Sequence, residues 1–190
     1  MSDFILASRS PRRKALLEQL GLSPQIVPSD VDESVEDGEA PVIYAQRVAW
    51  AKAEACVSSL PVLASDTVVA LDGRSLGKAE GVDAARAMLQ ALSGRTHYVH
   101  TAVVVRGLES ASTVVTAEVS FRSLGRFEVE RYLETDEPWD KAGAYGIQGL
   151  GGAFVEHIEG SYSGVVGLPI TETLRLLALN GVHPPEATRK

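Results

Sequence analysis

The chain has 190 residues, 45% of them hydrophobic and 23% charged, a composition typical of a globular protein rather than of disordered, collagen-like or disulfide-stapled chains. One domain over residues 1–190 is long enough to bury a core without a structural metal. The net charge of -7 repels nucleic-acid backbones and anionic membrane surfaces, so we expect neither a polynucleotide nor a membrane partner.

Two further features bear on the compartment. Cys56 is the only cysteine, so an intramolecular disulfide is excluded. The apolar stretch at residues 4–7 is too short for a signal-peptide core or a membrane span. We therefore expect a soluble cytoplasmic protein.

Strand and helix patterns alternate along the chain. Apolar and β-branched runs predict strands, at residues 4–7, 25–28, 62–71, 98–105, 113–121 and 153–158. Apolar residues at helical spacing predict helices, from Pro11 to Leu20, from Pro41 to the turn before Pro61, and at residues 83–92, 126–133 and 169–179. The runs at 98–105 and 113–121 are expected to pair antiparallel. Without repeats or a linker, this mixture predicts one α/β domain with a mixed sheet.

Three segments are predicted to be irregular. Residues 29–40 contain six acidic residues and form a loop, residues 145–152 form a glycine-rich loop, and residues 183–190 form a loose tail.

A basic cluster stands at the start of the first predicted helix, with Ser10 as the expected N-cap. It consists of Arg9, Arg12, Arg13 and Lys14. Free backbone N–H groups and the positive end of the helix dipole already favour an anion there, so cations gathered at the same end indicate a phosphate-binding site. The alternative is a solvated basic face.

A polar triplet, Ser65, Asp66 and Thr67, interrupts the apolar strand at 62–71. Burying these groups is unfavourable unless they have partners. Carboxylates from the triplet and from the acidic loop are suitable oxygen ligands for a hard divalent cation, which phosphate chemistry often uses. Asp66 is the best single candidate; the alternatives are a strand-end aspartate that caps local backbone and an acidic loop that is simply solvated.

Two glycine-containing segments fail as nucleotide-binding motifs. Residues 73–79 are similar to a P-loop but have one residue too few between the glycines and Ala79 in place of Ser or Thr, although Lys78 could still reach a phosphate. Residues 146–152 lack the dinucleotide-binding spacing. Their glycines are expected to allow a ligand close to the backbone, and Gln148 to read a base edge with its paired donor and acceptor.

Zinc and thiol chemistry are not supported. His97 and His100 are three apart on a predicted strand, which places them on opposite faces. Cys56 is predicted to be a packed small residue.

Six short blocks occur in order and with compatible spacing between about residues 4 and 178, namely residues 6–13, 65–67, 77–78, 92–94, 140–149 and 166–169. Together they resemble the Maf-type nucleoside triphosphate pyrophosphatases. The resemblance implies an α/β fold with a two-lobed mixed twisted sheet, flanking helices and a central cleft, similar to inosine triphosphate pyrophosphatases. It also implies hydrolysis of a nucleotide to monophosphate and pyrophosphate with Mg²⁺ or Mn²⁺, a house-cleaning role, a link to septum formation and a homodimer.

The resemblance also assigns residues to the cleft. It implies Asp66, Glu33, Lys52 and Lys78 as catalytic groups and Ser8, Arg12, Arg13, Thr67 and Gln148 as substrate-binding groups. Asp66 matches the proton acceptor, and Glu33 is its acidic partner at the metal. The two lysines would contact phosphates.

Arg12, Thr67 and Gln148 are similar to the subgroup that acts on dTTP and UTP. The subgroup that acts on 7-methyl-GTP carries an aromatic residue, a glutamine and a glutamate at these places. A neutral glutamine suits the donor and acceptor edge of uracil or thymine, whereas a glutamate suits cationic methylguanine. Three alternatives stay open: hydrolysis of 7-methyl-GTP, a nucleotide-binding regulator of cell division without turnover, and a scaffold whose charged clusters merely pair.

Overall fold

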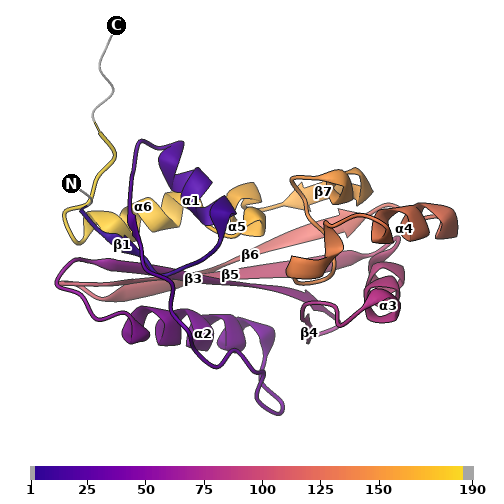
Figure 1. Cartoon of the computed structure of the whole chain (residues 1–190), viewed down its shortest axis with the longest axis horizontal. Helices are drawn as coiled ribbons and strands as arrows, with labels where there is room; N and C mark the ends of the chain where they lie inside the picture. Colours follow the sequence, from indigo (N-terminus) through magenta and orange to yellow (C-terminus); the bar gives the residue numbers. More distant parts are fainter. Residues whose placement is uncertain (1–2, 186–190) are drawn as a thin grey trace, which may run out of the picture.

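The computed structural model describes residues 3–185, in which strands and helices alternate from the start (Figure 1). The strands are β1 (Ile5–Leu6), β2 (Gln25–Ile26), β3 (Val62–Leu71), β4 (Arg74–Leu76), β5 (Thr96–Arg106), β6 (Ala111–Phe121) and β7 (Val155–Glu159). The α-helices are α1 (Pro11–Glu18), α2 (Pro41–Ala55), α3 (Val82–Leu92), α4 (Arg126–Leu133), α5 (Tyr162–Val166) and α6 (Ile170–Ala178). Two 3₁₀ helices, η1 (Pro138–Asp140) and η2 (Leu150–Phe154), precede β7.

All seven strands form one mixed sheet in the order β2-β1-β3-β5-β6-β7, with β4 added to β3. β1 is parallel to both neighbours, whereas β3, β5, β6 and β7 pair antiparallel. Helix α2 covers one face, and α1, α5 and α6 lie on the other (Figure 1). The far end of the long strands carries α3, α4 and β7, which form a second lobe. The mixed α/β fold and the antiparallel pairing of β5 with β6 are confirmed.

The core follows the alternation of side chains along the strands. Leu63 and Val103 point toward α1 and α6, where they pack in one hydrophobic cluster. Their neighbours Ala64 and Ala102 point to the opposite face and pack under the alanine-rich side of α2. A third cluster, between the sheet and α3 and α4, fills the second lobe. Both faces of the central strands are therefore buried.

The edge of β3 is uncovered between the two lobes. β1 pairs with β3 only at Val62 and Leu63, and β4 only from Val69 to Leu71. Within residues 3–185, no strand pairs with this edge of β3 between those two points. The polar triplet at residues 65–67 lies in this gap, so a cavity can form beside it without breaking the sheet.

The second strand of the β3–β4 hairpin was not predicted. Asp72 and Gly73 both have positive φ, at 51° and 74°, as a tight hairpin turn requires. The segment similar to a P-loop is therefore a hairpin strand. η2 occupies the start of the strand predicted at 153–158, because β7 begins only at Val155.

The structure also bears on the predicted tail and on membrane spans. Residues 183–185 have no regular structure, and the rest of the predicted tail, 186–190, lies outside the described residues. Among residues 3–185, no helix combines the length and the apolar character needed to cross a bilayer.

Candidate active site

A cavity of about 620 Å³ lies at the uncovered edge of β3, between the two lobes. It is within the size range of small-ligand sites. The structure brings all nine predicted site residues to its walls, namely Ser8, Arg12, Arg13, Glu33, Lys52, Asp66, Thr67, Lys78 and Gln148. Residues far apart in the sequence, from Ser8 to Gln148, thus line one cavity. The roles assigned to them remain predictions.

One wall carries two carboxylates around a single ammonium group. Lys52, in the last turn of α2, donates from Nζ to Asp66 Oδ1 at 2.8 Å and lies 3.0 Å from Glu33 Oε1. Lys52 and Asp66 are buried, whereas Glu33 is half-exposed. The attraction offsets the cost of burying the charges, so the acidic residue that interrupts β3 is partnered, as the sequence required.

This carboxylate pair fits a divalent cation that is shared with a phosphate ligand. The two carboxylate oxygens contact the same nitrogen, so they lie on the same side of the cavity. Mg²⁺ is commonly held by one or two carboxylates together with substrate phosphates. Among residues 3–185, no group of three or more His, Cys, Asp or Glu side chains is suited to hold a metal. Two carboxylates are fewer ligands than Mg²⁺ takes, so a cation held here would need further oxygen ligands from a bound phosphate or from water.

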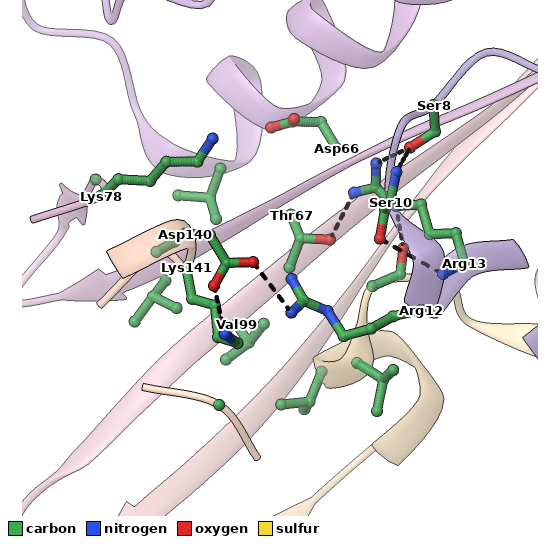
Figure 2. A pocket seen from close by; sticks show the side chains of 18 of the residues that line it. Ser8, Ser10, Arg12, Arg13, Asp66, Thr67, Lys78, Val99, Asp140 and Lys141 are labelled. Atoms are coloured by element: carbon green, nitrogen blue, oxygen red, sulfur yellow. Dashed lines mark hydrogen bonds and ion pairs between the residues drawn. The ribbon is translucent and has the colours of Figure 1, made fainter. Parts of the chain in front are cut away.

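Arg13 forms a buried strut beside Ser8 and Thr67 (Figure 2). Its Nε donates to the Gly167 carbonyl at 2.9 Å, Nη1 to Ser8 Oγ at 3.1 Å and Nη2 to Thr67 Oγ1 at 3.2 Å. The Ser65 hydroxyl donates to the same Gly167 carbonyl. Burial lowers the pKa of Arg13, which Asp66 partly opposes, and a guanidinium stays charged. The strut ties α1, β3 and the segment after α5 together.

The basic side chains at the start of α1 therefore lie in different environments, with Arg13 buried in the wall. Arg12 reaches across the cavity, with Nη1 3.8 Å from Asp140 Oδ2 (Figure 2). Lys14 turns away to Glu18 on the same helix. The alternative of a solvated basic face is wrong for Arg13, because its guanidinium is buried in the wall.

Lys78 stands on the second lobe, just after β4. Its backbone forms an isolated bridge with Ala142, and the residue is exposed at the cavity. In the described part of the chain, Lys78 makes no ion pair, so its ammonium is available to a ligand.

The glycine-rich loop is built around a carboxylate that the sequence did not reveal. A Cβ on Gly149 would lie 2.1 Å from Glu137 Oε2, and one on Gly146 would lie 2.9 Å from Oε1. A Cβ on Gly151 would meet the Tyr132 hydroxyl at 2.8 Å. Three of these glycines thus make room for the protein's own side chains. Gly146 and Gly149 also line the cavity, and the approach of a ligand to their backbone stays a prediction.

Glu137 is charged and well satisfied in this position. Its oxygens accept hydrogen bonds from the backbone N–H of Leu150 at 2.8 Å and of Gly151 at 2.9 Å, and from the Tyr132 hydroxyl at 2.9 Å. Burial alone would raise the pKa of Glu137, but these donors and Lys141 outweigh it and hold the pKa below its ordinary value. The carboxylate is therefore ionised at neutral pH.

Sequence comparison places this arrangement in a family. Residues 3–179 match the family model described as Maf-like protein, and the chain belongs to that family. The dTTP/UTP pyrophosphatase of Chromobacterium violaceum is 53% identical over 190 residues, covering 95% of this chain and 96% of its own. The dTTP/UTP pyrophosphatase of Anaeromyxobacter dehalogenans is 54% identical over 187 residues, covering 96% of each.

Two solved structures show weaker similarity. The Ham1 protein of Staphylococcus aureus is 17% identical with a TM-score of 0.43, over 62% of this chain and 71% of that one. A nucleoside-triphosphatase, dITP/XTP pyrophosphatase, of Mycobacterium abscessus is 20% identical with a TM-score of 0.39, over 64% and 75%.

Proposed function

We propose that the protein hydrolyses dTTP and UTP to the monophosphate and pyrophosphate. The observation that carries the proposal is that the Lys52-centred carboxylate pair shares one cavity with Arg12, Lys78 and Gln148. One region can thus act on a triphosphate while another reads the base. The relatives named dTTP/UTP pyrophosphatase, about half identical over nearly the whole chain, support this substrate class.

The reaction is proposed to depend on Mg²⁺ or Mn²⁺. Asp66 and Glu33 would hold the ion together with triphosphate oxygens, because their oxygens lie on the same side of the cavity. When bound, such an ion neutralises phosphate charge and lowers the pKa of a coordinated water. Lys52 keeps the two carboxylates together until a phosphate offers its ammonium a new partner.

The protein's own groups would share the hydrolysis as follows. The Asp66 carboxylate accepts the proton of the attacking water. Water adds across the α–β phosphoanhydride bond, and pyrophosphate leaves. Arg12, Lys52 and Lys78 stabilise the charge that develops on the leaving group.

The base is proposed to lie between the sheet and the glycine-rich loop. Val69 and Val99 line the cavity from β3 and β5, with Ile147 on the loop. These apolar side chains suit a planar base, while the Gln148 amide offers one donor and one acceptor to uracil or thymine.

The test is pyrophosphate release from dTTP, UTP, CTP, 7-methyl-GTP and the purine triphosphates with Mg²⁺ or Mn²⁺. We expect dTTP and UTP to be preferred, and Asp66→Asn to lose about 10²–10⁴ in rate. Asp72→Asn, in the exposed hairpin turn, is the matched control. A preference for 7-methyl-GTP would overturn the substrate assignment, and nucleotide binding without release from any substrate would favour a regulator.

Three further expectations rest on the resemblance and the overall charge. We propose a homodimer, a cytoplasmic location and a house-cleaning role linked to septum formation. Light scattering of the purified protein tests the first, and septum placement in cells that lack or overproduce the protein tests the last.

A further inference from the structure

The glycine-rich loop is tied at both ends to one carboxylate. Glu137 accepts directly from the N–H groups of Leu150 and Gly151. At the other end of the loop, Gly146 donates its N–H to the Tyr132 hydroxyl at 3.1 Å, and that hydroxyl donates to Glu137 Oε1. Residues 146–151 are thus closed around Glu137.

This internal carboxylate also occupies the place where the loop would otherwise attract an anion. Successive backbone N–H groups that point to one spot form an anion-binding concavity. In this loop the N–H groups of Leu150 and Gly151 already have an anionic partner. The triphosphate is therefore left to the side chains of Arg12, Lys52 and Lys78 around the cavity, and the loop to the base.

Gln148 lies between the two tied ends. It is exposed and lines the cavity, so little packing fixes it other than the conformation of the loop. A glycine-rich segment that lost its ties would sample many backbone conformations, and ordering it again on the base would cost conformational entropy. The direction in which the Gln148 amide faces thus depends on a carboxylate outside the loop.

We propose that Glu137 is a specificity-determining positioning residue, which holds residues 146–151 so that Gln148 can select a pyrimidine base. The proposal rests on the proposed function and deepens it. Glu137 acts through the loop and needs no contact with the reacting phosphates. No signal in the sequence pointed to it, because its partners are backbone groups 13 and 14 residues further along the chain.

The experiment compares kcat and KM for UTP, CTP and GTP in the wild type and in Glu137→Gln, which keeps the shape but replaces one oxygen by an N–H donor. We expect the UTP preference to fall about tenfold to a hundredfold, mainly through KM. Glu137→Asp, which keeps the carboxylate, should restore part of it. Glu134→Gln, at the exposed end of α4, is the matched control and should change nothing.

A second variant separates positioning from folding. Tyr132→Phe keeps the ring that packs edge-on against Phe154 and removes the hydroxyl that joins Gly146 to Glu137. The direct hydrogen bonds from Leu150 and Gly151 to Glu137 remain, so we expect an intermediate loss of base preference. A folded Glu137→Gln protein, or a folded Tyr132→Phe protein if the first does not fold, that kept the full UTP preference would overturn the inference.

The two proposals fail differently. A wild type that releases pyrophosphate without preferring dTTP and UTP contradicts both. A wild type with the preference and variants that retain it contradict only the role of Glu137. If the wild type binds nucleotides without releasing pyrophosphate, the proposed function fails. The affinities of the same variants for UTP and GTP are then measured by calorimetry. A ratio of the two affinities that equals the wild-type ratio overturns the inference.

Discussion

Arg12 and Asp140 face each other across the cavity from opposite lobes, with Nη1 3.8 Å from Oδ2. Both side chains are partly exposed, so the pair contributes at most about 1 kcal/mol. In the proposed function, a bound triphosphate would compete with Asp140 for the same guanidinium. The pair therefore restrains Arg12 in the absence of nucleotide.

Asp140→Asn should consequently lower KM for UTP, by up to about fivefold, with little change in kcat, because Arg12 no longer leaves a carboxylate to bind phosphate. Steady-state kinetics at low salt measures the effect, and it should shrink at high salt. Asp136→Asn, exposed nearby, serves as the control. A raised KM would mean that Asp140 itself supports nucleotide binding.

The carboxylate pair at Lys52 makes a prediction about thermal stability. Mg²⁺ alone should raise Tm little, since the Lys52 ammonium already contacts both Asp66 and Glu33 and competes with a cation for their oxygens. Mg²⁺ with a non-hydrolysable UTP analogue should raise Tm by mass action, and Asp66→Asn should remove most of that shift. An equal shift with Mg²⁺ alone would indicate a metal site made by protein groups only.

The sequence predicted those site residues whose chemical type is unusual at their position. Asp66 stood out because an acidic residue inside an apolar strand needs a partner, and the structure supplies Lys52. Which lysine would do so was not readable from the pattern, since α2 and β3 meet only in the folded sheet. The resemblance placed Lys52 in the cleft, but as a phosphate contact and not as the partner of Asp66.

The β4 hairpin and Glu137 were both missed, for different reasons. The hairpin turn at Asp72 and Gly73 carried a usable signal, because this dipeptide favours the positive φ values found there. Glu137 carried none: one acidic residue among 25 becomes distinct only when the backbone of residues 150 and 151 folds onto it. The glycines of the loop indicated that some group lies close to the loop backbone, but they did not indicate that this group is the Glu137 carboxylate.

The Arg13 strut should be important for stability as well as for the cavity. Arg13→Lys loses the fork that reaches Gly167, Ser8 and Thr67 and leaves acceptors unpaired. We expect a loss of about 1–3 kcal/mol in the free energy of unfolding by urea denaturation. Arg9→Lys, exposed at the same end of α1, should be neutral, and equal effects of the two changes would contradict a special role for Arg13.

His97 should make the second lobe sensitive to acid. Burial lowers the pKa of His97 from 6.5 to about 4, and its Nδ1 has no hydrogen-bond partner. The unfolded chain takes up the proton more readily, so stability present above pH 6.5 is lost as the pH falls toward 4. We expect a loss of about 3 kcal/mol between pH 7 and pH 4.

His97→Phe isolates this contribution from the other titrating groups. The ring it introduces suits the edge-on contacts that His97 makes with Phe121 and Tyr145. Urea denaturation at both pH values should show a smaller acid-induced loss in the variant than in the wild type. Equal losses would assign the acid sensitivity to carboxylates instead.

Gln148, which lines the cavity, should decide which base is accepted. Gln148→Glu replaces an amide that can both donate and accept by a carboxylate that only accepts. It should therefore repel the acceptor oxygens of uracil and favour a cationic, donor-rich base, changing the ratio of UTP to 7-methyl-GTP turnover by at least about tenfold. Gln148→Ala should weaken UTP turnover without improving 7-methyl-GTP, and a folded Gln148→Glu protein with the wild-type ratio would remove Gln148 from base selection.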